Sequence, residues 1–538
     1  MKKTLSILLI VAMLLSTVLV GCSKAENSSS NGNTTSGKSA VNANINLQGY
    51  PIVKNKITVK MMGAKHPIHG NWSDMVFFKE MEKLTNINFK FDTPAWDAFE
   101  EKKNLAFSSG DLPDVFFGGL LTKQQEVKYG SQGILIPLED YINKYCPNIQ
   151  DMFSKNPNVK KSVTAPDGHI YALPNITTAP LAMTSAMWMN KKWLDKFGIT
   201  DNQLPTNVDD LYKLFIKMKN EDPNGNGKKD EIPYSMNDKG EGFYYFLPAF
   251  GPYSRGIYAD KSGKIKYGFM EDNTKEFLKW CNKLWKEGLV DPDAFTQQYN
   301  DMAAKGSDNL IGAAVHAIPQ LIYGVTDPQV AATYPALPAQ SSSVNPTQQV
   351  ARSSGITTGT FAVTNKCKNV IEMMRWVDYL YSKEGSLLIH YGPEGNLWKY
   401  NDKKMRVYIQ PTDGRNVEEK RGGEITPDCG LPLPKWVRPD TETSWDDAQQ
   451  QTRAKQTDEK LWPYAVLPLP DIYFTVEEQD QVDVLNTDIE KYISENGAKF
   501  ITGDTPIENF DEFRNTLKKM GIEKLIGLYQ TAYDRWKK

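Results

Sequence analysis

The chain has 538 residues, of which 40% are hydrophobic and 24% are charged, and its formal net charge is −2. This near balance, without a clustered basic surface, argues against a nucleic-acid-binding protein. The length exceeds what a single hydrophobic core usually supports and predicts two lobes or more.

The N-terminus has the pattern of a secretory signal. Lys2 and Lys3 precede an apolar run, and Leu19-Val-Gly-Cys22 resembles the bacterial lipobox, in which the cysteine becomes the lipidated first residue. We expect residues 1–21 to be removed and Cys22, diacylated with palmitate, to hold the protein on the extracytoplasmic face of the cell membrane. A plain signal peptide with a coincidental cysteine is the alternative.

Residues 22–47 are rich in Ser, Asn, Thr and Gly and predict a flexible linker.

Strand and helix patterns alternate after the linker. Strands are predicted at residues 57–62, 87–91 and 115–117, with helices between them. This order predicts a parallel sheet with right-handed crossovers. Ligands bind such sheets at the carboxyl ends of the strands, so we expect the loops that carry Trp72 and Trp96 to line a cleft.

The middle of the chain predicts a second α/β lobe. Strands are expected at residues 185–190 and 310–316, and helices at 206–218, 275–287, 370–385 and 510–536, the last broken at Gly521. Cys146, Cys281, Cys367 and Cys429 are widely spaced and are expected to be buried free thiols, although a disulfide among them stays open.

Residues 222–231 have the spacing of a calcium loop. Oxygen-bearing side chains alternate along it, and Gly227 stands sixth, where such a loop turns sharply. Position twelve of the EF-hand pattern is Pro233, so Glu231 would have to supply the bidentate carboxylate. The expected ligands of a structural Ca²⁺ are Asp222, Asn224, Asn226, the Lys228 carbonyl, Asp230 and Glu231. A surface turn rich in Asn, Asp and Gly is the alternative.

Four further motifs occur in a characteristic order: Ser109-Gly-Asp-Leu-Pro-Asp-Val-Phe116, Pro166-Asp-Gly-His-Ile-Tyr-Ala-Leu-Pro174, Met189-Asn-Lys-Lys-Trp-Leu194 and Tyr391-Gly-Pro-Glu-Gly395. With the lipobox and the linker, they resemble family 1 of the extracellular solute-binding proteins, in the lipoprotein branch found with oligosaccharide ABC importers. The chain is also similar to the alginate-oligosaccharide-binding proteins, whose calcium loop has the same pattern.

The resemblance implies a two-lobed α/β fold of the periplasmic-binding-protein type II, with a mostly parallel sheet in each lobe and a multi-segment hinge. The expected N-lobe comprises residues 48–165 and about 305–365, and the C-lobe residues 166–304 and about 366–538. The resemblance implies a monomer that binds an oligosaccharide in the interlobe cleft and delivers it to transmembrane permease subunits. Only the lipid anchor would touch the membrane.

Sugar rings stack on aromatic side chains, and Arg pairs with sugar carboxylates, but most aromatic residues build cores. Candidate sugar contacts are Trp72, Trp96, Trp188, Arg352, Trp398 and Trp436. For each tryptophan the alternative is a place in the core, and for Arg352 it is an exposed loop.

The sequence contains no zinc-protease, nucleophile-elbow or P-loop motif, which favours a binding protein over an enzyme. A tethered, calcium-stabilised polysaccharide hydrolase or lyase, using a carboxylate pair such as Asp291 and Asp293, remains the alternative. A structural adhesin or sensor-coupled binder is a third reading.

Overall fold

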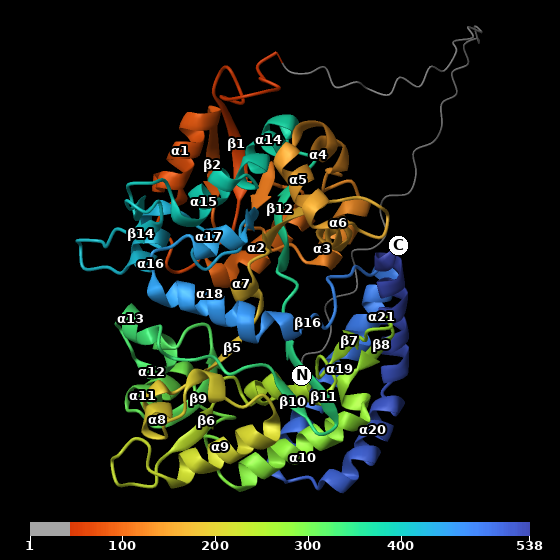
Figure 1. Ribbon diagram of the computed structural model, residues 1–538. Helices are drawn as coiled ribbons and strands as arrows, with labels where there is room; N and C mark the ends of the chain where they lie inside the picture. The colour runs from red at the N-terminus through yellow and green to blue at the C-terminus, as the bar shows by residue number, and fades with distance from the viewer. Residues whose placement is uncertain (1–42) are drawn as a thin grey trace, which may run out of the picture. The chain divides into compact units, whose positions relative to one another are not determined.

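The computed structural model describes residues 43–538 (Figure 1). The predicted signal peptide, Cys22 and most of the predicted linker lie outside the described residues. Within the described range, no helix has both the length and the apolar character that a membrane span requires.

The first lobe is built on a six-stranded sheet in the order β15-β4-β12-β3-β1-β2. Its strands are β1 (Ile57–Met62), β2 (Ile87–Asp92), β3 (Val115–Phe117), β4 (Ala172–Thr177), β12 (Ile356–Val363) and β15 (Lys435–Val437). β1 runs parallel to β2 and β3, and β15 runs parallel to β4. β12 runs antiparallel to both of its neighbours, because the chain returns from the second lobe into β12 at the end of the sheet where β4 leaves it. Five of the six strands therefore run in the same direction and only β12 is reversed, so the expectation of a mostly parallel sheet is confirmed for this lobe.

Helices cover both faces of this sheet, because successive strand residues point to opposite faces. They are α1 (Val76–Thr85), α2 (Trp96–Ser109), α3 (Lys123–Ser131), α4 (Glu139–Tyr145), α5 (Pro147–Lys155), α6 (Pro157–Val163), α14 (Val370–Leu380) and α15 (Lys383–Tyr391). The short helix α16 (Val417–Lys420) buries no residue. Phe117 meets Trp376 of α14, with 5.5 Å between ring centroids, whereas its neighbour Phe116 meets Phe107 of α2 at 5.2 Å. α14 and α2 therefore lie on opposite faces. The hairpin of β13 (Trp398–Tyr400) and β14 (Arg406–Tyr408) follows α15.

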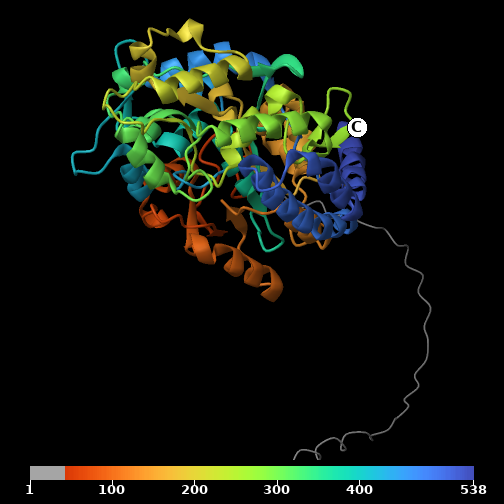
Figure 2. The same ribbon diagram turned by 90° about the horizontal axis from the view of Figure 1, so that it is seen from below.

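The second lobe is built on a three-stranded sheet in the order β5-β9-β6. β5 (Ala186–Met189) runs antiparallel and β6 (Ile232–Ser235) parallel to the central β9 (Ile311–His316), so this sheet is also mixed. Its helices are α8 (Lys191–Lys196), α9 (Val208–Asn220), α10 (Asp272–Lys286), α11 (Tyr299–Ser307), α12 (Gln320–Tyr323), α13 (Pro328–Ala331), α19 (Val476–Thr502), α20 (Phe510–Lys519) and α21 (Ile522–Lys537), and β7 (Ile257–Ala259) pairs with β8 (Ile265–Tyr267). Figures 1 and 2 show the C-terminal helices (blue) packed beside α10.

The chain passes between the two sheets three times, at residues 178–185, 352–355 and 438–475. These segments carry α7 (Pro180–Met183), α17 (Pro439–Thr443), α18 (Ala448–Lys460) and β16 (Ala465–Val466). β16 pairs with β11 (Asn345–Ala351), which also pairs with β10 (Gln340–Ser342).

Strand pairing divides the chain differently from the expected boundaries. Residues 305–365 were expected in the first lobe, but β9 pairs within the second sheet, and only β12 of that stretch joins the first. Residues 366–538 were expected in the second lobe, but α14 packs on the first sheet and β15 is its edge strand. The cores agree with the pairing: the buried residues of α14 join the hydrophobic core of the first lobe, and Ala313 of β9 joins that of the second.

Candidate functional site

The predicted calcium loop connects α9 to β6. Asn207 begins α9 by accepting a hydrogen bond from the Asp210 N–H (2.9 Å). Asp222, Gly225 and Gly227 have positive φ angles of 45°, 74° and 73°, which turn the backbone tightly. Glycine adopts this conformation without the strain that a Cβ would cause, which explains the requirement at position 227.

The oxygen atoms of this loop gather around its turn. The Asp222 carboxylate accepts the backbone N–H groups of Asn226 and Gly227, both at 3.1 Å. Asn224 Oδ1 also accepts the Asn226 N–H (3.0 Å), and the amides of Asn224 and Asn226 donate to Asp230 Oδ1 at 3.1 and 3.0 Å. Lys228 donates its backbone N–H to Asn226 Oδ1 (2.8 Å). Five of the six expected ligand residues are thus joined in one network.

Glu231, the sixth, supplies a test of whether a cation fits. Its side chain is buried, and its Oε1 atom has no hydrogen-bond partner. Burial and the nearby carboxylates of Asp230 and Asp222 raise its pKa. A buried carboxylate oxygen without a partner is costly unless a donor or a positive charge compensates it, so a divalent cation suits this donor set. No three His, Cys, Asp or Glu side chains cluster as a metal site within residues 43–538, so a cation here would also depend on amide and carbonyl oxygens.

The loops that follow β1 and β2 meet at the carboxyl edge of the first sheet, as expected. Lys65 and Ala95 form a backbone bridge, and Trp96 donates its N–H to the Lys65 carbonyl (2.9 Å). The Trp96 side chain is 41% exposed and meets the His66 ring edge-on, with 5.6 Å between centroids. An exposed, positioned indole at this edge is suited to stacking on a sugar ring.

Trp72 lies in the core and not on a cleft surface. It is only 2% exposed and packs against Phe78, Phe91 and Phe117, with ring centroids 5.7–6.0 Å apart. Its Nε1 atom lies 3.4 Å from Nδ1 of His69. Trp72 begins the short 3-10 helix before α1 and turns inward, so the expectation that its face lines the cleft is wrong.

Arg352 lies in a cavity of about 360 Å³ beside the crossing segments. Its guanidinium lies 5.3 Å from the ring centroid of Trp462 and donates to the Ser353 carbonyl (3.0 Å). Lys155 is the second cationic residue of the lining, which contains no Asp or Glu: Lys155, Asn156, Pro157, Asn158, Val159, Ser162, Ile176, Thr177, Thr178, Met183, Arg352, Ser354, Ile356, Trp462, Leu467 and Pro470. We call this cavity the hinge pocket. Its charge suits a neutral or anionic ligand.

The other three candidate tryptophans are largely buried, and of these Trp436 contacts two residues of the hinge pocket, Thr178 and Lys155. Trp188 in β5 donates to the His316 carbonyl (2.9 Å), and Trp436 in β15 donates to Thr178 Oγ1 (3.1 Å) while Arg438 stacks on its ring at 3.8 Å. Trp398 donates to the Gly392 carbonyl (2.9 Å) and borders an outer cavity of about 380 Å³ between α1 and α15. The structure does not bring the six candidates together.

The carboxylates suggested for a hydrolase are held by other groups. Asp291 is fully buried and accepts hydrogen bonds from Ser235 (2.6 Å) and Gln297 (2.9 Å). Lys305 pairs with both Asp291 (2.7 Å) and Asp293 (2.8 Å). Burial alone would raise the pKa of Asp291, but these partners outweigh it and hold the pKa below its ordinary value. The pair therefore works as an ion-paired support at the end of β6.

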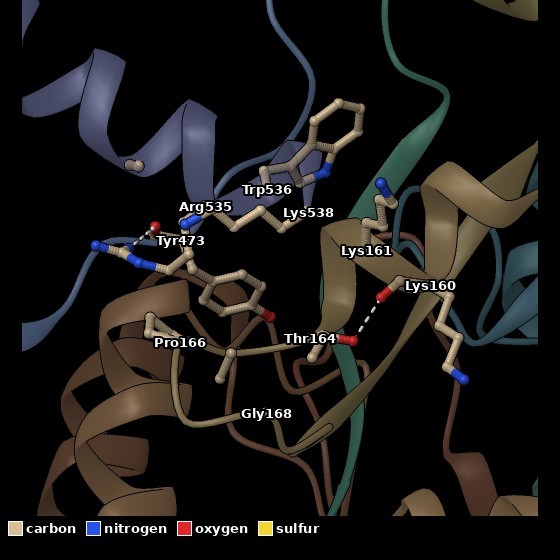
Figure 3. A pocket seen from close by; sticks show the side chains of 11 residues that line it. Lys160, Lys161, Thr164, Pro166, Gly168, Tyr473, Arg535, Trp536 and Lys538 are labelled. Carbon is tan, nitrogen blue, oxygen red and sulfur yellow. Dashed lines mark hydrogen bonds between the residues drawn. The ribbon is translucent and has the colours of Figure 1, made fainter.

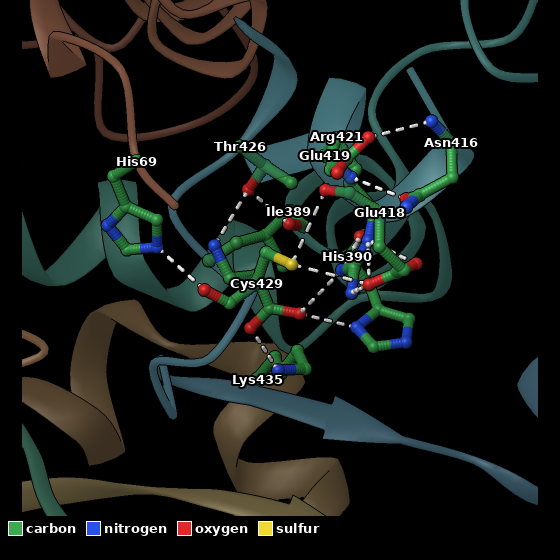
Figure 4. A network of polar contacts seen from close by, with 11 residues as sticks. His69, Ile389, His390, Asn416, Glu418, Glu419, Arg421, Thr426, Cys429 and Lys435 are labelled. Atoms are coloured by element: carbon green, nitrogen blue, oxygen red, sulfur yellow. Dashed lines mark hydrogen bonds and ion pairs between the residues drawn. The ribbon is translucent and has the colours of Figure 1, made fainter. Parts of the chain in front are cut away.

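A buried polar network, which sequence patterns did not indicate, holds the loop after α16 beside the first sheet (Figure 4). Asp428 accepts contacts from His390 and Lys435, and Arg421 donates to the His390 carbonyl (2.8 Å). His69 Nε2 lies 2.7 Å from the Cys429 carbonyl. Burial raises the pKa of the Cys429 thiol to about 11, so it is no nucleophile at neutral pH. The network has a supporting role.

The four cysteines expected to be thiols are free and buried. This confirms the expectation for Cys146, Cys281, Cys367 and Cys429.

Comparisons with known proteins agree with this architecture. Over 514 residues the chain is 29% identical to the fructooligosaccharide ABC transporter substrate-binding protein FusA of Streptococcus pneumoniae, covering 90% of this chain and 92% of FusA. Structures of FusA with kestose, and of its EF-hand mutant with fructo-nystose, align with a TM-score of 0.72 at 26% identity over 89% of this chain and 99% of theirs. The polygalacturonan/rhamnogalacturonan-binding protein YtcQ of Bacillus subtilis is 24% identical, over 58% of this chain and 57% of YtcQ.

These relatives are named as binding proteins and not as enzymes. Together with the two mixed sheets and three crossing segments, they identify the fold as the two-lobed type II architecture of periplasmic binding proteins. Residues 63–386 match the model of the bacterial extracellular solute-binding proteins. This chain therefore belongs to the bacterial extracellular solute-binding protein family.

Proposed function

We propose that the protein is the extracellular substrate-binding subunit of an ABC importer and binds an oligosaccharide between its two lobes. The observation that carries the proposal is the relation to FusA over nearly the full length of both chains. The partners would be the oligosaccharide and the transmembrane permease subunits that receive it, with the protein acting as a monomer.

Two surfaces support sugar binding. Trp96 presents an exposed aromatic face at the carboxyl edge of the first sheet. The hinge pocket adds the Arg352 guanidinium beside Trp462, with the polar groups of Asn156 and Asn158. Apolar sugar faces stack on such rings, and the polar groups pair with hydroxyls or a carboxylate. Trp188, Trp398 and Trp436 would contribute only if their buried faces became accessible.

The lobes are proposed as residues 44–177 with 356–437, and residues 186–350 with 476–538. A sugar that touches both lobes binds one lobe arrangement better than others, and its differential contacts shift the population towards that arrangement. The three crossing segments would absorb the rotation, as hinge segments do in other two-lobed binders.

The loop at residues 222–231 is proposed to hold a structural Ca²⁺. Its ligands would be Asp222, Asn224, Asn226, the Lys228 carbonyl, Asp230 and Glu231. The unpaired Oε1 atom of buried Glu231 supports the proposal, and so does the name of the FusA EF-hand mutant. The ion would neutralise the clustered carboxylates and fix the connection between α9 and β6.

Calcium titration in thermal unfolding tests this site. We expect calcium to raise the melting temperature, and Asp222→Ala to lower it and remove the calcium response. Asp209→Ala is the matched control, because it removes an exposed carboxylate from the neighbouring helix α9. A calcium response that survives in Asp222→Ala would disprove the site.

Lipidation of Cys22 is proposed to attach the protein to the cell membrane through palmitate-containing acyl chains after removal of residues 1–21. The support is the Leu19-Val-Gly-Cys22 sequence and the extracellular family. Two acyl chains bind a bilayer stably, at about 0.8 kcal/mol per buried CH₂.

The importer proposal is tested by titration calorimetry with kestose and with oligogalacturonates, followed by chromatography of the recovered sugar. We expect one of these sugars to bind at one site per chain and to be recovered intact. A shortened sugar would replace the proposal with the hydrolase or lyase alternative. Failure of every oligosaccharide to bind would overturn it.

A further inference from the structure

The last helix, α21, packs in the core of the second lobe and ends beside α6 of the first lobe; Figure 3 shows Trp536 and Lys538 near Lys161. At its end, Trp536 Nε1 donates a hydrogen bond to Ser162 Oγ of α6 (3.1 Å). Lys161, next to Ser162, donates from Nζ to the Lys537 carbonyl (2.7 Å), and its ammonium lies 5.6 Å from the ring centroid of Trp536. The two helices thus exchange hydrogen bonds in both directions.

These bonds join two separately packed bodies. Val159 and Val163 fix α6 in the hydrophobic core of the first lobe, and Ile522 and Leu525 fix α21 in the core of the second. In the described part of the chain, the hydrogen bonds that join the two lobes outside the crossing segments are those donated by the side chains of Trp536 and Lys161. A rotation of one lobe against the other must therefore stretch or break them.

The end of α21 is also tied to the third crossing segment. Arg535 donates to the Tyr473 carbonyl (3.2 Å) and pairs with Glu478 (2.5 Å). The Tyr473 hydroxyl donates to the buried Glu126 carboxylate of α3 (2.6 Å). These contacts hold the end of α21 beside the hinge, where Trp536 meets Lys161 and Ser162 of α6 at the wall of a cavity of about 260 Å³.

We infer that Lys161 and Trp536 form a clasp that sets the resting angle between the lobes. They are positioning residues for ligand binding: they act through the population of lobe arrangements and not by touching the sugar. One net hydrogen bond changes such a population ratio by roughly 2- to 10-fold. The effect on affinity rests on the proposed function, whereas the effect on the resting angle does not.

The test measures interlobe distances in the unliganded full chain. Spin labels are attached at Lys102→Cys in α2 and Lys196→Cys in α8, both exposed positions, and Cys22→Ser removes the cysteine that lies outside the described residues. The other four cysteines are buried and stay unlabelled.

Two variants remove the clasp, and each has a matched control. Lys161→Ala is compared with Lys160→Ala on the same helix. Trp536→Phe, which keeps an aromatic ring but loses the N–H, is compared with Lys537→Ala. The Lys537 side chain pairs with Asp534, and its carbonyl, which accepts from Lys161, survives the substitution.

We expect both clasp variants to broaden the distance distribution and both controls to keep it. The apparent Kd for sugar should change by roughly 2- to 10-fold. It should fall if the interlobe distances of the variant shift towards those of the sugar-bound protein, and rise if they shift away from them. An unchanged distribution in both clasp variants overturns the inference, and so does an affinity change opposite to the population shift. If no sugar binds, the proposed function fails while the distances still decide the clasp.

Discussion

Separate replacement of Trp72 and Trp96 by alanine tests which aromatic residues belong to the core. Trp72 is 2% exposed and contacts three phenylalanine rings, so Trp72→Ala leaves a cavity that the surrounding sheet cannot close. Truncation of such a side chain costs about 3–5 kcal/mol of unfolding free energy. Trp96 is 41% exposed at the sheet edge, and surface truncation usually changes stability by about 0.5 kcal/mol or less.

The assay combines thermal unfolding with sugar titration. A loss of 1 kcal/mol lowers the melting temperature of a domain of this size by roughly 2–4 °C, so Trp72→Ala should melt roughly 6–20 °C early. Its folded fraction should keep its affinity. Trp96→Ala should melt normally but lose roughly 2 kcal/mol of binding free energy, which is about thirtyfold in Kd.

Trp72→Phe is the control, because it keeps an aromatic ring in the core and should recover part of the stability. The reasoning is refuted if Trp72→Ala melts normally while losing sugar, since Trp72 would then face the ligand. It is equally refuted if Trp96→Ala melts early and binds normally.

Four further predictions address the metal, pH, the anchor and ligand charge. Asp222→Ala should abolish the rise in melting temperature caused by calcium, as read by differential scanning fluorimetry. Burial raises the pKa of Glu126 from 4.5 to about 7, so the folded state holds a proton that the unfolded state releases. The unfolding free energy should therefore fall by up to roughly 3 kcal/mol between pH 5 and 8, and Glu126→Gln should remove this slope in urea titrations at several pH values. Cys22→Ser should abolish acyl labelling in cells without changing the sugar affinity of the purified protein; persistent labelling would contradict the lipobox assignment. Arg352→Ala should weaken binding of oligogalacturonates more than that of kestose, and equal effects in calorimetry would remove the idea of an acidic ligand.

Local sequence patterns predicted many elements of the fold. The alternating residues at 57–62 and 87–91 became β1 and β2, because a half-buried strand needs one apolar face. The break at Gly521 separates α20 from α21, and its φ of 94° explains why the helix stops there. The turn at Gly227 was predicted for the same reason.

Long-range pairing could not be predicted in the same way. Nothing local to residues 356–363 shows that β12 runs between β3 and β4, since register and direction depend on partners more than 170 residues away. The 27-residue helix α19 was missed because its buried residues are sparse along a mostly polar sequence.

In the candidate site, too, local features could be predicted from the sequence and long-range contacts could not. The proposed calcium loop could be recognised because all of its expected ligand residues lie within ten positions of each other. Trp72 and Trp96 follow strands in similar ways, but one side chain turns into a phenylalanine cluster and the other stays exposed, which depends on packing from α1 and β3. The hinge pocket gathers Lys155, Arg352 and Trp462 from three distant stretches, and no spacing pattern signals that.

The pairing of β15 with β4 also has a consequence for how the chain is made. Lys435 of β15 lies opposite Asn175 of β4, so the sheet of the first lobe lacks its edge strand until residues 435–437 are available. During synthesis, a ribosome that has completed β4 must still add about half of the chain before β15 can pair with β4 and complete this sheet. Such non-local topology slows folding. Slow folding leaves time for an exported chain to cross the membrane unfolded. A fragment ending near residue 178 would lack β12 and β15, two of the six strands of this sheet.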